Sequence, residues 1–250
     1  MKPSAPATPP PRKRDAHATR QTLLSTAERL FVDKGFDGTR IDDIADKARV
    51  NKRMLYVYFG NKEQVYDEVL RHNYQRLLSL GRVTVDPSLT PVQQAEAAVR
   101  RYFRFVADNP TYVRLVGWES LSQRSSPFLA QFLSAGLEDM QAALRKGVQS
   151  GVFRKNLDVR KLLMSINALC ITYFSRKSLL EPLWNIDMSA PAVQQDLLDH
   201  ILSLVMNGIL ADPSATASAT RARSSARTAA KQSSRGGRPR SRKSPGGTSP

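Results

Sequence analysis

The stretch TRIDDIADKARVNKRMLYVYFGNK, residues 39–62, decides the fold. Apolar residues recur at helical spacing in two short segments, and a tight turn at Arg49 separates them. We expect Thr39 to cap the first helix and Asn51 to cap the second. Two short helices crossed over such a turn form a helix-turn-helix, whose second helix enters the major groove of DNA. DNA binding is therefore the leading functional hypothesis.

The second helix of this motif divides its side chains between an inner and an outer face. Its spacing turns Leu55 and Phe59 inward. The other long side chains remain available on the outside, namely Lys52, Arg53, Met54, Tyr56 and Tyr58. Two of them keep a second interpretation, because Tyr58 is also compatible with partial burial and Met54 with simple packing.

Helical patterns continue on both sides of the motif. An apolar stripe precedes it and ends at Gly35, a natural helix stop. Asn61 and Gln64 form a cap-like pair that begins a longer helix after it. The sequence predicts a three-helix head joined to a fourth helix.

The motif and its flanks resemble the tetracycline-repressor (TetR) family of bacterial one-component regulators. The matching residues are AERLFVDKGFDGTRIDDIADKARV, residues 27–50, and LYVYFGNKEQVYDEVL, residues 55–70. Farther along, only an all-helical second domain of family-like length matches. The resemblance implies that this second domain dimerises and binds a small molecule that weakens DNA binding.

The resemblance also implies roles for residues of the head. Phosphate contacts are implied for Thr39, Tyr56 and Lys62, and base and backbone contacts for positions on the second helix. Those positions are Lys52, Arg53, Met54 and Tyr58, and Asn51 at the helix start completes the candidate DNA-binding set. Arg49 replaces the glycine usual in the family's turn. A residue other than glycine in this left-handed conformation costs on the order of 1 kcal/mol. Arg49 is itself a candidate phosphate contact.

The net charge of +16 is concentrated at the two ends. Residues 1–20 hold five Lys or Arg and one acid, and the last forty residues hold nine and one. Both ends are rich in small residues and proline and poor in large apolar residues, which is typical of disorder. The predicted organisation is a disordered basic arm at 1–17, the head at 18–64, a helical ligand-binding and dimerisation domain at 65–210, and a disordered Arg/Ser-rich tail at 211–250.

The tail contains a Gly-Arg-Pro sequence flanked by arginines. Arg235, Arg238 and Arg240 resemble an AT-hook, a short peptide that lies in the narrow minor groove, although two glycines replace the usual one. The alternative is a generic polycation that contacts phosphates without preference. Either form raises non-specific affinity and its dependence on salt.

The rest of the chain predicts an all-α fold with short connections. The expected helices span 91–107, 111–122, 126–150, 158–180 and 191–210, with breaks at Asn109-Pro110, Ser126-Pro127, Gly151 and Glu181-Pro182. The last two have broad apolar faces and are the predicted dimerisation helices. Their alternative role is to complete the core of the monomer.

A ligand cavity between these helices is expected to use large side chains. The candidates are Tyr102, Phe105, Tyr112, Trp118, Phe128, Phe132, Met164 and Tyr173. Each has plain core packing as its alternative. Few charged residues fall among them, so the predicted effector is an apolar or aromatic small molecule.

Other classes of protein fit the sequence less well. His17, His72 and His200 lack metal-ligand spacing, and we find no catalytic motif, so neither an enzyme nor a metal or cofactor site is predicted. The single Cys170 suits a reducing cytoplasm, and no apolar run spans a bilayer. The sequence predicts a homodimeric, sequence-specific regulator of palindromic operators, a cytoplasmic, nucleoid-associated repressor released by its effector. The alternative is an architectural protein that binds DNA non-specifically through its basic ends.

Overall fold

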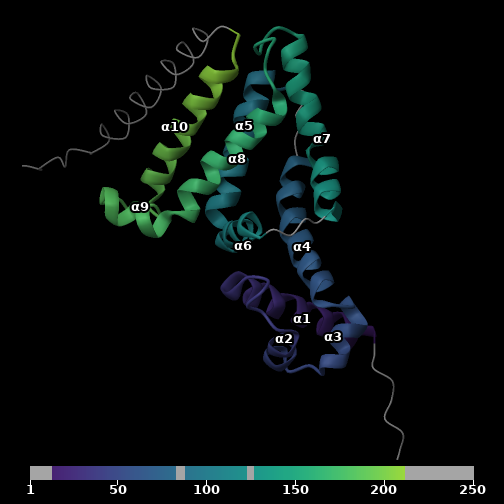
Figure 1. Ribbon diagram of the computed structural model, residues 1–250. Coiled ribbons are helices and arrows are strands. Elements are labelled where there is room, and N and C mark those ends of the chain that lie inside the picture. Colours follow the sequence, from purple (N-terminus) through teal and green to yellow (C-terminus); the bar gives the residue numbers. More distant parts are fainter. Residues whose placement is uncertain (1–12, 83–87, 123–126, 212–250) are drawn as a thin grey trace, which may run out of the picture.

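The computed structural model describes residues 13–82, 88–122 and 127–211, and these form an all-helical fold (Figure 1). Most of the predicted tail, including Arg235, Arg238 and Arg240, lies outside the described residues. The predicted boundary of the first arm is wrong, because helix α1 (Lys13–Lys34) already includes residues 13–17. Alanines at positions 16 and 18 favour a helix there. The predicted arm was therefore too long, because the proline-rich composition ends before these alanines.

The head consists of α1, α2 (Ile41–Ala48) and α3 (Lys52–Phe59). The apolar stripe of α1 is buried, with Leu23, Ala27 and Phe31 fully inaccessible. Ile44 and Leu55 bring α2 and α3 onto the same core. Gly35 ends α1 with φ of +68°, a conformation that suits glycine.

Helix α4 (Lys62–Arg82) connects the head to the body. Asn61 and Gln64 exchange hydrogen bonds at its start, so the predicted capping pair is confirmed. One end of α4 packs against α1, and the helix also packs against α7 of the body (Figure 1). Helix α4 therefore contacts both the head and the body.

The body contains six helices among the described residues. They are α5 (Pro91–Asp108), α6 (Pro110–Leu121), α7 (Pro127–Gln149), α8 (Val159–Ser175), α9 (Lys177–Trp184) and α10 (Pro191–Ile209). The expectation of one helix over 158–180 is wrong, because the chain breaks at Arg176 and Pro182 lies inside α9. Proline has no backbone N–H, so α9 lacks the hydrogen bond from position 182 to the carbonyl of Ser178. Ser178 is exposed, and the short helix tolerates this loss. No described helix is both long and apolar enough to cross a membrane.

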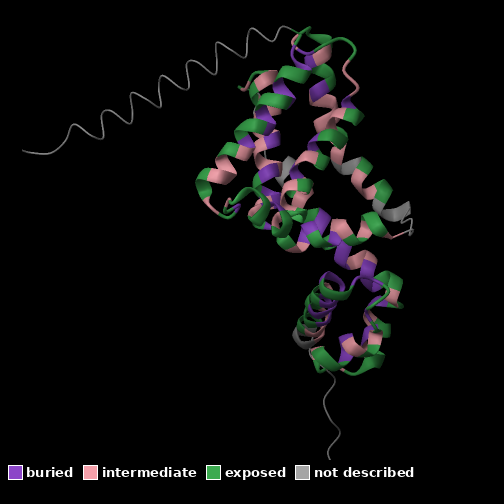
Figure 2. Cartoon of the chain, turned by 60° about the vertical axis from the view of Figure 1, so that its left-hand side comes forward, coloured by how far each residue is buried: buried purple, intermediate pink, exposed green. Residues whose placement is uncertain are grey.

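Most of the apolar face of α10 is buried within the chain itself, as Figure 2 shows for the interior of the body. Ile201 and Ile209 belong to the core together with Cys170 of α8. These two helices therefore do complete the monomer core. Several large apolar side chains of the same region remain exposed, namely Met164, Leu179, Leu183, Trp184 and Leu204.

Candidate nucleic-acid interface and effector cavity

The turn between α2 and α3 has the geometry that the sequence predicts. Arg49 adopts φ of 55° and ψ of 39°, in the left-handed region. The amide of Val50 donates to the carbonyl of Ala45 at 3.0 Å and closes the turn. The small side chain of Ala45 is buried where the two helices cross. The arginine thus replaces the family's glycine without loss of the turn, and its side chain is exposed.

Helix α3 presents a ridge of side chains to solvent. Asn51 begins the helix, since its side-chain oxygen accepts a hydrogen bond from the Arg53 amide at 2.9 Å, as predicted for a cap. Arg53, Tyr56 and Val57 are exposed, with 66% of Val57 accessible. These three positions share one face, because they are three and four residues apart. Sequence reasoning missed Val57, although its spacing from Arg53 was a visible signal.

Met54 and Tyr58 have intermediate positions on α3. Both are half-buried, and Tyr58 packs against the head core with its ring in an edge contact with Phe59. The alternative of partial burial is therefore confirmed for Tyr58. Met54 is partly accessible, so contact with DNA remains a prediction for it.

Thr39 does not have the position that was predicted for it. Its side chain is inaccessible, and its hydroxyl lies 2.7 Å from the Gly35 carbonyl oxygen and 3.1 Å from that of Leu30. The capping prediction is wrong, because Arg40 occupies the N-cap position of α2. A phosphate contact by the Thr39 side chain is excluded in this conformation. The hydroxyl instead donates its one proton to a carbonyl at the C-terminal end of α1 or at Gly35, which follows it.

Basic side chains of the head differ in the contacts that they make with other side chains of the protein. Lys52 lies 2.5 Å from Asp42, and the hydrogen bond to that carboxylate raises the pKa of the lysine. The Lys62 ammonium lies 4.2 Å from the centroid of the Phe36 ring, a cation–π contact. Arg49 and Arg53 are exposed and form no ion pair with any described residue.

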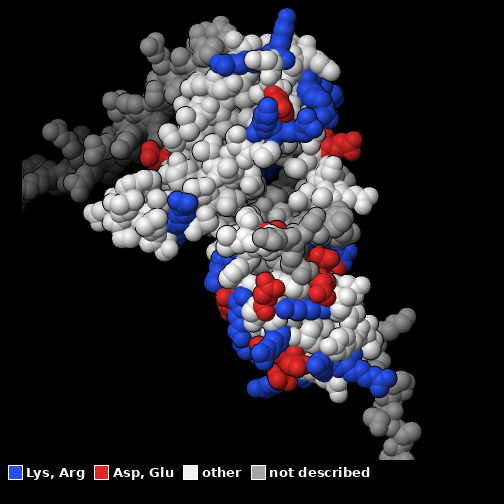
Figure 3. Space-filling view, viewed as in Figure 1, with Lys and Arg blue, Asp and Glu red and all other residues white. Residues whose placement is uncertain are grey.

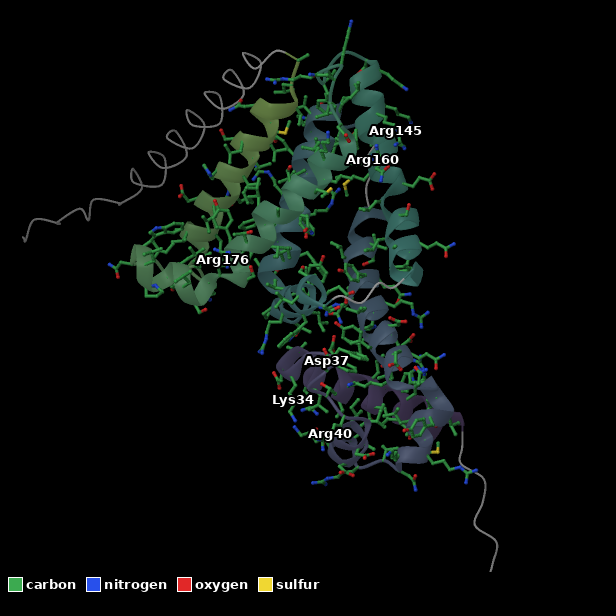
Figure 4. All side chains as sticks on the ribbon, viewed as in Figure 1. Lys34, Asp37, Arg40, Arg145, Arg160 and Arg176 are labelled. Atoms are coloured by element: carbon green, nitrogen blue, oxygen red, sulfur yellow. The ribbon has the colours of Figure 1, made fainter. Side chains whose placement is uncertain are left out.

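Arg40 is an additional basic residue that sequence reasoning missed. It is exposed at the start of α2 and has no ion-pair partner within 13–82, 88–122 and 127–211. Figure 4 labels it on the head, together with Lys34 and Asp37. In Figure 3, blue basic groups alternate with red acidic ones over the head, whereas much of the body in this view is white. The head therefore carries local cationic positions on a surface of mixed charge.

Helix α6 of the body contacts the head directly. The indole nitrogen of Trp118 donates to the carbonyl oxygen of Val32 in α1 at 3.0 Å. Its ring covers Gly35 so closely that an added Cβ would lie 2.9 Å from the ring. Next to it, Glu119 accepts a hydrogen bond from the Tyr66 hydroxyl of α4 at 3.3 Å. We call these contacts the α6 joint.

A cavity of about 750 Å³ lies within the body. Its described lining comes from α4 to α8 and α10 together with Phe153 between α7 and α8, and most of it is apolar. Three predicted residues line it: Tyr102, Tyr112 and Met164. The described lining of this cavity does not include Phe105, Trp118, Phe132 or Tyr173. Phe105 and Phe132 pack in the core, and Trp118 belongs to the α6 joint. The side chain of Phe128 lies outside the described residues.

Sequence reasoning missed most of the polar residues of the cavity. They include Tyr74, Arg101, Arg160 and Asn167. Asn167 donates a hydrogen bond to the Tyr102 hydroxyl, and burial raises the pKa of Tyr102 and of Tyr112 well above the usual value. The four missed residues lie on three helices, α4, α5 and α8. No local sequence pattern could bring them together.

The head and the body together define a class of protein. An exposed helix after a tight turn, on a small head joined to a helical domain with an internal cavity, is the architecture of a helix-turn-helix DNA-binding regulator. Comparison with known proteins is consistent with this class. Residues 23–69 match the family described as bacterial regulatory proteins, tetR family, and residues 91–205 match the tetracyclin repressor-like C-terminal domain.

Individual relatives and structures agree with both matches. The chain is 29% identical over 210 residues to the HTH-type transcriptional repressor NicS of Pseudomonas putida, covering 79% of this chain and 95% of that one. It is 31% identical over 159 residues to the HTH-type transcriptional repressor SCO4008 of Streptomyces coelicolor, covering 62% and 78%. The crystal structure of the putative transcriptional regulator SCO4942 from Streptomyces coelicolor aligns with a TM-score of 0.59 and 25% identity, over 73% of this chain and 96% of that one.

The chain belongs to the TetR family of transcriptional regulators. The predicted fold class and the predicted DNA-binding regulatory function are thereby confirmed. The family is one of regulators, not of enzymes.

Proposed function

We propose that this chain is a homodimeric repressor that occupies a palindromic operator on the chromosome in the cytoplasm and leaves it when a small molecule enters the cavity. The observation that carries this proposal is that α4 and α6 each line the cavity and each contact the head. Tyr74 and Leu77 of α4 and Tyr112 and Val116 of α6 line it. A ligand that moves either helix therefore acts on the head.

Sequence is read by the exposed ridge of α3. Arg53 has the length and the donors to contact a guanine edge, and the Val57 methyl groups suit a thymine methyl. Phosphate contacts come from Arg40, Arg49 and Lys62, with Lys52 and Tyr56 at the edges of the ridge. The Lys52–Asp42 pair weakens the contribution of Lys52, because that ammonium must leave a carboxylate 2.5 Å away to reach a phosphate.

Dimerisation uses the exposed apolar side chains around α8, α9 and α10. Leu183 and Trp184 are 62% and 55% accessible, and Leu204 is 49% accessible. Large apolar side chains exposed together favour contact with a second copy. Two bodies joined there hold two heads at a fixed separation, and a palindrome needs about 34–36 Å between the recognition helices.

Release requires that the cavity and the DNA-bound head favour different positions of α4 and α6. The α6 joint makes such coupling specific, because Trp118 is fixed to α1 by one hydrogen bond and by close contact with Gly35. A coupling of about 1–3 kcal/mol is typical of allosteric proteins and corresponds to roughly 5–150-fold in affinity.

The proposal is tested by selecting bound fragments from random and source-genome DNA, once with the full chain and once with residues 1–212. We expect both proteins to recover the same short palindrome. The second candidate function is an architectural protein, which the basic composition of residues 211–250 favours. Recovery without sequence preference, lost on removal of the tail, would replace the repressor by that second function.

A further inference from the structure

The charges that line the cavity all have one sign. Its described lining contains two arginines, Arg101 of α5 and Arg160 of α8, and neither an aspartate nor a glutamate. The remainder consists of tyrosines, amides and apolar side chains. A cavity that is otherwise apolar and carries uncompensated positive charge favours a ligand with a negative group.

Arg101 is the more enclosed of the two arginines. It is half-buried, and burial lowers the pKa of its guanidinium. It forms no ion pair with any described residue. Its neighbour Arg100 differs, since that side chain lies 3.8 Å from Asp199 of α10. One arginine of this pair thus has a carboxylate partner on α10, and the other lines the cavity.

Arg160 lies at the first turn of α8 and is exposed (Figure 4). The Asp158 carboxylate accepts hydrogen bonds from the Arg160 and Lys161 amides and lies 3.7 Å from the Lys161 ammonium, and it also interacts with the Arg160 charge. That carboxylate is therefore occupied as the helix cap. The guanidinium of Arg160 has no ion-pair partner among the described side chains.

A neutral donor adds to these charges. The Tyr102 oxygen accepts a hydrogen bond from the Asn167 side-chain amide. A tyrosine hydroxyl has one proton to donate. Because this oxygen is the acceptor in that contact, the hydroxyl of Tyr102, which lines the cavity, keeps its own proton for donation.

From this arrangement we infer that the effector is an organic anion, with an apolar body in the cavity and an acidic group held by Arg101. This inference rests on the proposed function and narrows the effector to one chemical class. It refines the expectation of an apolar or aromatic molecule, which describes only the body of such a ligand. Tyr102 and Arg160 provide the second and third donors for the acidic group.

The test uses two fluorescent dyes that differ in one group. They are 8-anilinonaphthalene-1-sulfonate and N-phenyl-1-naphthylamine, which has the same rings without the sulfonate. We expect the full chain to bind the sulfonate dye roughly tenfold or more tightly, the effect of a charge-assisted hydrogen bond in a partly buried site. Arg101→Met should remove most of this preference. The matched control is Arg104→Met, which removes an exposed arginine of the same helix that does not line the cavity.

A third variant establishes where the dyes bind. Ala98 lines the cavity, so Ala98→Trp should fill it and weaken both dyes. Thermal unfolding and circular dichroism establish that each variant is folded. The inference is overturned if the neutral dye binds as tightly as the sulfonate, if Arg101→Met keeps the preference, or if Ala98→Trp leaves sulfonate binding unchanged. Dye binding is measured without DNA, so this result is independent of whether a specific operator is found.

Discussion

The head and the body differ in how their functional residues are distributed along the chain. The candidate DNA-binding residues of the head all lie within positions 39–62, and two short helices bring them to one surface. The cavity draws its lining from positions between Tyr74 and Ile209, on six helices and the connection between α7 and α8. A surface that reads DNA can be built from local structure, whereas a cavity between helices requires the whole domain.

Separating the two bodies should have the largest effect. Leu204→Glu places a charge among the exposed apolar side chains of α10 and should produce a monomer. Loss of the second head should reduce operator affinity on the order of 10²-fold or more, because binding of the second half-site is no longer intramolecular. Sedimentation and operator titration measure both effects. Ser203→Glu, the adjacent exposed position, is the control; a Leu204→Glu protein that stays dimeric places the interface elsewhere.

Removing one base-contacting side chain from the head should have the next largest effect on DNA binding. Arg53→Ala is expected to cost about 1–3 kcal/mol of binding and to relax preference at one operator position. Lys62→Ala should weaken binding to all sequences alike and reduce the salt slope by about one. Titrations on the selected site and on single-base variants separate these outcomes. Equal losses on every sequence for Arg53→Ala would assign it to the phosphates.

The buried threonine of the head should affect folding more than DNA contact. Thr39→Val leaves a carbonyl at the end of α1 or at Gly35 without its hydroxyl donor, at a cost of about 1–3 kcal/mol in the free energy of unfolding. Thr22→Val is the control, because that exposed hydroxyl donates to the Ala18 carbonyl at 2.9 Å within α1. Denaturant unfolding measures the difference. A Thr39→Val protein of unchanged stability that loses DNA affinity would restore Thr39 to the DNA interface.

The contrast between the two regions also explains what the sequence could predict. The turn at Arg49, the cap at Asn51 and the buried Leu55 depend on neighbours a few residues away, and all three were predicted correctly. Thr39 was misplaced because its hydroxyl turns back toward Leu30 and Gly35, so the N-cap position of α2 falls to Arg40. For the cavity, the size of a side chain indicated candidate lining residues, but the sequence did not show which side chains point into the cavity. Arg101 and Arg160 were missed because the sequence does not show whether an arginine has a carboxylate partner in space. That depends on the fold.

The smallest effect is expected where the head meets α4. Burial opposes ionisation of Glu68, but hydrogen bonds from Arg71 and Arg20 lower its pKa below the ordinary 4.5. A lowered folded-state pKa stabilises the protein above pH 4.5, and this contribution is lost as pH falls through the folded value. Glu68→Gln should therefore make stability less dependent on pH in that acidic range. Unfolding measured between pH 6 and pH 3, with exposed Glu63→Gln as control, tests this; identical pH profiles for wild type and Glu68→Gln would contradict it.

The central claim is that the body holds two heads at a fixed separation on one face of DNA. Its most direct test is the affinity for the selected palindrome after five base pairs are inserted between its half-sites, which turns one half-site by about half a helical turn. We predict that affinity falls to that of a single half-site. Affinity that does not depend on the spacing would contradict the claim, since the two heads would then bind independently.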